Sequence, residues 1–436
     1  MLERRQPGLL RPPSLLIPSG QQNQGSSWSD SQLMFNSRPS FILAANDLGA
    51  GEVDLVLARG TGSATFTRAT TATTVDSAGT IVSVASGTAR SWYDPTTLVY
   101  GGYLAEGART NLCLQSEDFN TTWVPSDATI ANVASPTSPY GTGTADSFTE
   151  STDVGVTSHQ DVQGITVLDA TAHTASVWAK SGVRNQLRLT FATGTTNAAG
   201  LFDLDTGTVS GVTGSATITA YQGGWYRCTI TGTTDGTSMN MFIFSKVGGL
   251  DYQGDGSLCF YLWGAQLEAA PFASSYIPTT TAAVTRNADV LTYPSSGNAV
   301  TAQGTIFCEL STYAVANSFS SFSISDGTAT NAVEGGNSGT VARYLVRSSG
   351  TQADVGAGTI VNNVIYKQGS VWNTNYAKTC KDGELSVLDS VVTVPADFSI
   401  IHIGTRYSSL PIFGTVKNVR IWDFQVADNY LREWTR

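Results

Sequence analysis

Two pairs of aspartates have a spacing that acid–base chemistry on a sugar could use. Asp203 and Asp205 stand in LFDLDTG, and Asp251 and Asp255 in LDYQGDG. Glycoside hydrolysis needs two carboxyl groups about 5–10 Å apart, and residues i and i+2 of a strand share a face about 6–7 Å apart. Both segments are also typical of turns, and a calcium or sugar loop is the alternative for the second. The turn interpretation is favoured, so no catalytic pair is predicted.

Other catalytic patterns are missing from the sequence. His159 has Asp161 beside it in SHQDV, but no serine or cysteine elbow accompanies them, so we expect both side chains at the surface. The three histidines are far apart and no cysteine pair lies near them, which predicts no metal site. No nucleophile elbow, zinc-protease or phosphate-loop motif occurs. The sequence therefore predicts a protein that is not an enzyme.

Binding of sugars is the other chemistry that the residue types allow. Sugar-binding β-sandwiches place aromatic rings against the apolar face of a pyranose. The aromatic residues in predicted loops are Trp92, Tyr93, Tyr140 and Tyr252. These four are the candidate glycan-binding residues. Loop aromatics also fill seams between domains, which is the alternative.

The composition predicts strands as the elements that carry these residues. Charged residues make up only 13% of the 436-residue chain, and there are 44 glycines. Such a chain favours strands and tight turns over helices. The five cysteines are scattered, and Cys259 and Cys308 lie in apolar strands, so buried free thiols are expected.

The charge balance and the apolar pattern restrict the partners. A net charge of −10 argues against nucleic acid, because phosphate binding needs a basic face. No run of 18 apolar residues exists, so no membrane span is predicted. Prolines and Arg11 interrupt the apolar residues of MLERRQPGLLRPPSLLIPSG, so a signal peptide is not expected. A protein that works outside a cell would then leave by lysis, as virion proteins do.

Four segments follow from the pattern along the chain. Residues 1–41 are rich in proline and polar residues and predict an extended arm. Residues 42–112 predict a small β unit and a hinge. Residues 113–283 contain regular short strands, which are typical of a sandwich. Residues 284–436 predict a second sandwich that ends in one short helix, ADNYLREWTR.

The hinge segment GARTNLCLQSEDFNTTW spans residues 107–123. NLCLQS alternates like the first strand of the sandwich. Phe119 and Trp123 are expected to plug the sandwich edge, with an exposed sugar platform as the alternative. Arg109 is expected to pair with Glu106 across the hinge.

One strand, SLCFYLWG, is apolar on both faces. Phe260 and Leu262 alternate with Tyr261 and Trp263. A strand of this kind is covered on both sides, so a second cover must come from a neighbouring domain, another protomer or a bound sugar. We predict a homotrimer with Tyr261 and Trp263 near its seam. The alternative places both residues in the core of their own sandwich.

Several segments resemble a known family. ATFTRATTATTVDSAGTI, RSWYDPTT, GGYLAEGARTNLCLQSEDFNTTW and LWGAQLEAAPFASSYIPT, in this order, look like phage head fibre or head spike virion proteins. Residues 113–278 also resemble the jelly roll of carbohydrate-binding modules. Residues 287–436 resemble a concanavalin A/laminin G-like sandwich, through IIHIGTR and GTVKNVRIWDFQVADNYLREWT. The expected fold is all-β, with tandem jelly-roll sandwiches after an extended N-terminal arm.

The resemblance implies a phage virion protein on the particle surface, such as a head fibre or decoration protein. Residues 1–41 would anchor it to a capsid or other virion protein, and weak glycan or host-surface adhesion is implied. A tail-fibre or tailspike receptor-binding protein is one alternative, and a secreted glycan-active enzyme with accessory modules is another. Many related jelly rolls hold calcium through paired aspartates, where this chain has Gly264 and Ala265. No cofactor is therefore predicted, although Glu117 and Glu268 could supply oxygens.

Overall fold

The computed structural model describes residues 32, 35–36, 39–141, 143–152, 155–315, 318–406 and 409–436. Strands dominate these residues, and the longest helix among them is α2 (Asp428–Trp434), which matches the predicted C-terminal helix. The all-β prediction is confirmed. The predicted arm lies almost wholly outside the described residues.

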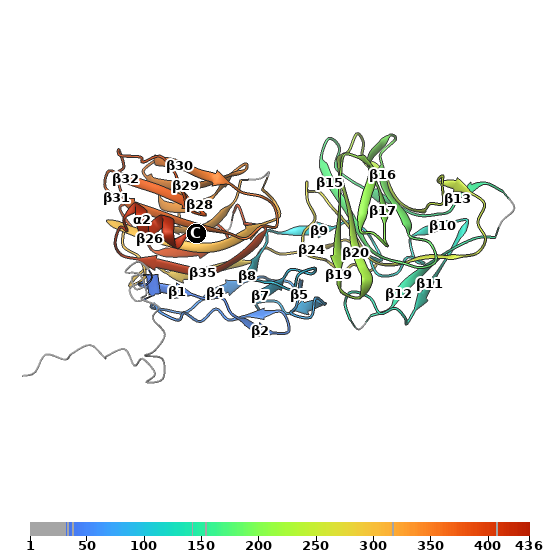
Figure 1. Cartoon of the computed structure of the whole chain (residues 1–436), viewed down its shortest axis with the longest axis horizontal. Helices are drawn as coiled ribbons and strands as arrows, with labels where there is room; N and C mark the ends of the chain where they lie inside the picture. Colours follow the sequence, from blue (N-terminus) through green and yellow to red (C-terminus); the bar gives the residue numbers. More distant parts are fainter. Residues whose placement is uncertain are drawn as a thin grey trace, which may run out of the picture. The chain divides into compact units, whose positions relative to one another are not determined.

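The first sandwich consists of two six-stranded antiparallel sheets (Figure 1). One sheet contains, in spatial order, β10 (Val124–Ser126), β14 (Gln160–Thr166), β21 (Ser238–Ser245), β16 (Gln186–Ala192), β17 (Thr196–Asp203) and β18 (Thr208–Thr213). The other contains β11 (Ala128–Val133), β12 (Ala145–Glu150), β23 (Leu258–Glu268), β15 (Ala172–Ser181), β20 (Trp225–Thr233) and β19 (Ser215–Tyr221), with the 3-10 turn η1 (Gln222–Gly224) between the last two.

Strict alternation builds the core of this sandwich. Leu187, Leu189 and Phe191 of β16 are fully buried, as their period of two predicts. Phe119 and Trp123 join the same core, and their ring centroids lie 5.0 Å apart. The prediction that they plug the sandwich is confirmed. The segment NLCLQS, however, is a strand only at its first residue.

The second sandwich takes strands from both ends of the chain. Its larger sheet contains β2 (Asp47–Gly49), β3 (Glu52–Val53), β7 (Arg90–Tyr93), β8 (Tyr100–Ala105), β35 (Gly414–Trp422), β26 (Gln303–Thr312), β31 (Tyr366–Asn373), β32 (Tyr376–Lys381) and β33 (Glu384–Leu385), with β1 (Phe41–Leu43) also paired to β35. The other contains β30 (Thr351–Thr359), β29 (Val341–Ser348), β28 (Asn331–Ser338), β27 (Ser320–Ser325), β34 (Ile400–Ile403), β25 (Val290–Pro294) and β4 (Thr65–Thr67).

This topology corrects two predicted boundaries. Residues 42–112 do not form a β unit of their own, because most of their strands extend the two sheets of the C-terminal sandwich. The arm also ends before residue 41, since Phe41 is fully buried in the second core and pairs with Ile421. Pairings between strands this far apart in the sequence give no local signal, which is why the pattern suggested a separate unit.

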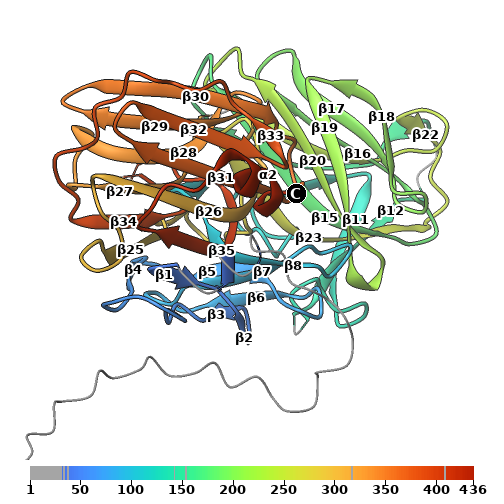
Figure 2. The same ribbon diagram turned by 60° about the vertical axis from the view of Figure 1, so that its left-hand side comes forward.

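The second core lies between the two larger sheets. Phe41, Tyr103, Ile306 and Trp372 are among its buried members, which come from strands of both chain ends. Helix α2 covers the opposite face of β31 (Figure 2). Its residue Leu431 is fully buried.

Three short two-stranded ribbons complete the described part of the fold. The two segments that join the sandwiches pair with each other as β9 (Arg109–Asn111) and β24 (Val284–Arg286) (Figure 1). Strands β5 (Ala72–Val75) and β6 (Ile81–Val84) form a hairpin, and β13 (Thr157–Ser158) pairs with β22 (Asp251–Tyr252).

The β5–β6 hairpin covers the outer face of β23. Trp263 is 1% exposed and packs in one cluster with Ile81 of β6, Trp178 and Tyr276. Gly264 has a φ of +68°, and a Cβ there would lie 2.8 Å from the Trp178 ring, so only glycine fits. Trp263 therefore lies at a buried seam within one chain, and its burial needs no second protomer. Tyr261 is half-buried beside this cluster, and the homotrimer stays a prediction.

Candidate functional site

A cavity of about 350 Å³ lies where the two sandwiches and the β5–β6 hairpin meet. We call it the junction cavity. One wall belongs to the first sandwich and consists of Trp178, Ser215, Ala216, Thr217, Thr219, Tyr221, Arg227, Thr229 and Thr231. The other walls consist of Thr73–Val75, Ile81, Trp92, Asp94, Pro95, Leu104, Glu106, the loop 271–276, Tyr313, Asn362 and Asn363. Aromatic rings and hydroxyl groups predominate in this lining, which is typical of a small-molecule site with few orienting polar groups.

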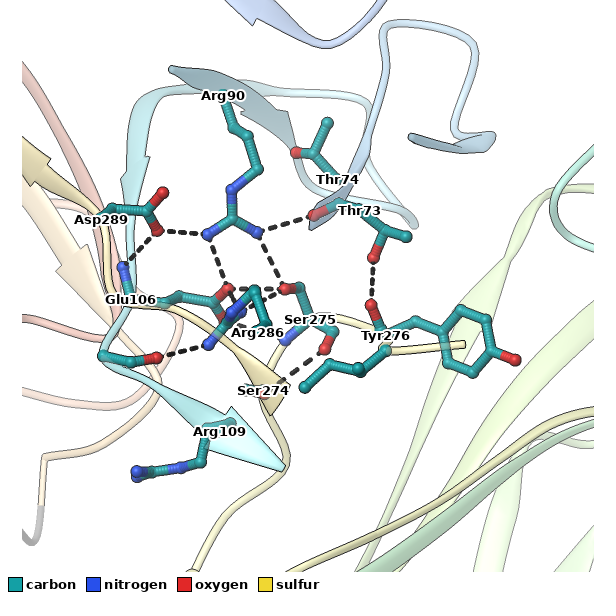
Figure 3. A network of polar contacts seen from close by, with 12 residues as sticks. Thr73, Thr74, Arg90, Glu106, Arg109, Ser274, Ser275, Tyr276, Arg286 and Asp289 are labelled. Carbon is teal, nitrogen blue, oxygen red and sulfur yellow. Dashed lines mark hydrogen bonds and ion pairs between the residues drawn. The ribbon is translucent and has the colours of Figure 1, made fainter. Parts of the chain in front are cut away.

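A buried ionic cluster supports one side of the junction cavity (Figure 3). Arg90 pairs with both Glu106, at 2.9 Å, and Asp289. Arg68 reaches Asp289 at 2.8 Å, and Arg286 pairs with Glu106. All five side chains are at most 1% exposed. Arg90 lies in β7, Arg286 in β24 and Glu106 directly after β8. Arg90 also donates to the Thr73 carbonyl of the β5–β6 hairpin at 2.7 Å, so the cluster fixes the cavity wall.

Further hydrogen bonds complete the cluster at Glu106. The Ser275 amide and hydroxyl donate to its carboxylate at 2.8 and 2.6 Å, and Tyr313 of the second sandwich also donates. Burial acts to raise the pKa of Glu106, but the adjacent Arg286 and Arg90 outweigh it and lower the pKa to about 2. Glu106 is therefore a fixed anion and a poor proton donor near neutral pH.

Arg109 does not pair with Glu106, so that prediction was wrong. Its guanidinium carbon lies 4.2 Å from the ring centroid of Phe413 and 5.0 Å from that of Phe272. Arg286, opposite Arg109 in the β9–β24 ribbon, takes the ion pair instead. The sequence could not show that Arg286 would face Glu106, because the two residues lie 180 positions apart.

Only Trp92 among the predicted sugar-binding residues lines the junction cavity. Its ring packs on the backbone of β8, because a Cβ at Gly101 would lie 2.7 Å from the indole. Tyr93 is half-buried, and its hydroxyl donates to Asp47 at 3.2 Å. Tyr140 is half-buried against Trp263, with ring centroids 6.2 Å apart. The four residues are therefore not brought together.

Tyr252 was wrongly expected to present its ring in a loop. It is 8% exposed, and its hydroxyl contacts Glu150 at 2.6 Å and Ser245 at 2.8 Å. The His159 ring packs against it at a tilt of 50°, with ring centroids 4.5 Å apart. His159 is itself buried and contacts the Asp127 carbonyl through Nδ1 at 2.5 Å, so its predicted surface position was also wrong.

The aspartate pairs take structural positions. Asp203 accepts the backbone amides of Asp205 and Thr206 at 3.1 and 2.9 Å, as the turn interpretation predicts. Asp255 lies 3.0 Å from Arg184, which also pairs with Glu150. Neither pair lines the junction cavity.

Asp161 is fully buried, contrary to the prediction of a surface position. Its Oδ1 accepts the amide of Val162 at 3.0 Å, while Oδ2 has no hydrogen-bond partner. Burial, together with the nearby Asp146, raises the pKa of Asp161 to about 8. The alternation of β14 contained this signal, since Asp161, Gln163 and Ile165 share the inward face.

The described residues show no group of three or more side chains suited to a metal ion. Glu268 accepts hydrogen bonds from Ser274 and Gln266, and Glu117 from Tyr276. The absence of a cofactor stays a prediction. No helix in the described ranges is long and apolar enough to cross a membrane. All five cysteines are buried free thiols, as predicted.

The residues of the ionic cluster were missed by the sequence reasoning, except Glu106. Arg286 and Asp289 stand in VTRNAD, at the start of the segment that was predicted as the second sandwich. Charged residues in a chain with few charges are a weak signal for such a cluster. Their partners lie about 180 to 220 positions away in the sequence, so no local pattern could identify them.

Comparisons with known proteins leave the family open. No family model matches the chain, and no curated protein matches it either. Among solved structures, a Trypanosoma rangeli sialidase in complex with the inhibitor DANA has a TM-score of 0.26 at 10% identity, over 67% of this chain. This chain covers 66% of that sialidase, slightly under two thirds of its length.

Two further similar structures are of the sandwich types that the sequence resembles. Domains LG4-5 of the mouse laminin α1 chain have a TM-score of 0.25 at 10% identity, over 73% of this chain and 89% of theirs. The CBM22-1–CBM22-2 tandem domain of Paenibacillus barcinonensis Xyn10C has a TM-score of 0.25 at 12% identity, over 73% and 99%. These TM-scores are too low to support an argument about function. No comparison supports the phage head fibre resemblance.

Proposed function

We propose that this chain is a non-enzymatic virion surface protein that binds a glycan in the junction cavity. The observation that carries the proposal is the cavity itself, where Trp92 and other aromatic rings stand among hydroxyl-bearing side chains. Rings that stack on a pyranose, combined with polar groups that orient its hydroxyls, are the usual components of a sugar site.

Binding without catalysis is favoured by the carboxylates of the cavity. Asp94 and Glu106 are the two that line it. Asp94 accepts the amides of Thr96 and Thr97 at 3.0 and 2.7 Å, which fixes it in a turn. Glu106 is held by two arginines, which lower its own pKa to about 2. Glu106 is therefore unsuited to the role of a general acid, which needs a raised pKa.

Trp92→Ala is expected to weaken glycan binding at least tenfold, because it removes a stacking surface in the cavity. Glycan-array screening followed by calorimetry measures this, and mass spectrometry of the recovered glycan checks that it is not cleaved. Tyr93→Ala is the matched control, since Tyr93 is the next residue of β7 and does not line the cavity. Equal loss in both variants, or a cleaved glycan, would contradict the proposal.

The location on a phage particle rests on the sequence resemblance and on the proposed anchor. Because Phe41 belongs to the core, the anchor is tested by removing residues 1–38 only. We expect the shortened protein to fold and to be lost from purified particles, as measured by immunolabelling in electron microscopy. Normal incorporation of this variant would exclude an anchoring role for the arm.

A further inference from the structure

One wall of the junction cavity carries a regular row of hydroxyl groups. Strand β19 lies at the edge of its sheet and alternates: Ala216 and Ile218 pack against the first core, and Ser215, Thr217 and Thr219 line the cavity, which Ala216 also borders. On the paired strand β20, Thr231 and Thr229 stand opposite Ser215 and Thr217 in register. We call these five residues the hydroxyl row.

The outer members of the row have free hydrogen-bonding capacity. Ser215, Thr217 and Thr219 are exposed, and among the described residues their hydroxyls have no protein hydrogen-bond partner. Each hydroxyl can donate one hydrogen bond and accept two. A row of such groups, spaced two residues apart along a strand, suits a ligand that itself carries a series of hydroxyls.

The charges of the cavity favour a ligand without net charge. Glu106 is neutralised by Arg90 and Arg286. The remaining ionisable lining residues, Asp94 and Arg227, have opposite signs. The guanidinium of Arg227 donates to Ser176 at 3.0 and 3.2 Å and to the Ser274 carbonyl at 2.9 Å, and stacks 4.4 Å from the Trp178 ring centroid. These partners of Arg227 are neutral, so within the described lining its positive charge is balanced by the carboxylate of Asp94.

The size of the cavity limits the length of the ligand. Its volume of about 350 Å³ lies near the lower end of the range of about 300–1,000 Å³ that is usual for small-molecule sites. A long polysaccharide would extend beyond it. The cavity suits a short oligosaccharide or the end of a longer chain.

We infer that the junction cavity selects the neutral end of a short glycan, and that the hydroxyl row forms hydrogen bonds with the hydroxyl groups of that sugar. This inference rests on the proposed glycan-binding function and deepens it. The row orients the sugar through Ser215, Thr217 and Thr219 while Trp92 supplies the apolar surface. Acidic sugars are disfavoured, because their carboxylate or sulfate would lose hydration beside the carboxylate of Asp94, while the guanidinium of Arg227 is already engaged with protein groups.

The test compares neutral, sialylated and sulfated oligosaccharides of one to six units on an array with the whole chain. Calorimetry with the tightest neutral binder then compares the wild type with the double variant Thr217→Val, Thr219→Val. Valine keeps the shape and the strand preference of threonine and removes only the hydroxyl. We expect roughly tenfold weaker binding, since each hydroxyl contributes a hydrogen bond of modest net strength. Thr213→Val is the control, on an exposed position of β18 outside the cavity.

The outcomes separate this inference from the function on which it rests. Neutral glycans bound by the wild type, with a loss in the double variant and none in Thr213→Val, support it. Binding that survives in the double variant but is lost in Trp92→Ala overturns the role of the hydroxyl row and leaves the proposed function standing. Preference for sialylated or sulfated glycans overturns the selection of neutral sugars only. Binding to no glycan overturns both.

Discussion

Glu106→Gln is expected to lower the free energy of unfolding by about 3–5 kcal/mol. The substitution keeps the shape of the side chain but removes one of the two carboxylates that balance Arg68, Arg90 and Arg286. Breaking a buried ion pair costs this much because a charge is left without compensation away from water. Chemical denaturation near pH 7 measures the change.

The exposed pair Arg343–Asp354 provides the control for Glu106→Gln. Its side chains are 32% and 48% exposed, so Asp354→Asn should cost less than about 1 kcal/mol. The folded pKa of Glu106 lies below its unfolded value, so its stabilisation is present above the unfolded pKa, about 4.3, and is lost as the pH falls toward 2. Glu106→Gln should therefore flatten this acid dependence. Equal, small effects of both variants would show that the cluster does not hold the junction together.

Asp161→Asn is expected to stabilise the protein at alkaline pH by about 5 kcal/mol and to change little near pH 4. Asp161 is fully buried, and its pKa is raised to about 8, chiefly by burial. The raised value means that ionisation costs more in the folded state than in the unfolded chain. The free energy of unfolding therefore falls as the pH rises from about 4 to 8, by about 1.4 kcal/mol per pH unit. Asparagine carries no charge at any of these values.

Denaturation curves at pH 4 and pH 9 test this prediction for Asp161→Asn. The matched variant is Asp203→Asn, because hydrogen bonds from the Thr206 and Asp205 amides lower the pKa of Asp203. The expected stability change of Asp203→Asn therefore has the opposite sign to that of Asp161→Asn. The ionised carboxylate of Asp203 stabilises the fold, so the variant should be slightly less stable above about pH 4. A destabilised Asp161→Asn at pH 9 would mean that the ionised side chain is solvated or paired in solution.

The sequence by itself determined the elements and the residues that face inward. Alternation in β16 identified Leu187, Leu189 and Phe191, and the aromatic pair Phe119 and Trp123 was correctly placed in a core. These results depend on a local rule: neighbouring strand residues point to opposite faces, so burial appears directly in the pattern. The same rule identified both apolar faces of β23, whose second cover remained open.

Only the tertiary structure decided which segments meet. Strands from residues 41–105 joined sheets made by residues 290–422, and Ile81 of a hairpin covered Trp263. Pairing over such distances depends on the whole set of sheets, and one strand sequence is compatible with many partners. The sequence could therefore indicate that Trp263 is buried, but not whether a neighbouring segment or another protomer buries it.

The candidate site was hardest to predict for the same reason. Trp92 was identified from its residue type alone, whereas the hydroxyl row and the Glu106 cluster depend on contacts between three separate parts of the chain. Serine and threonine are frequent everywhere in this sequence, so nothing distinguished Thr217 and Thr219 before β19 was placed beside the cavity. Local physics sets the direction of each side chain, and the assembly of sheets decides what that side chain faces.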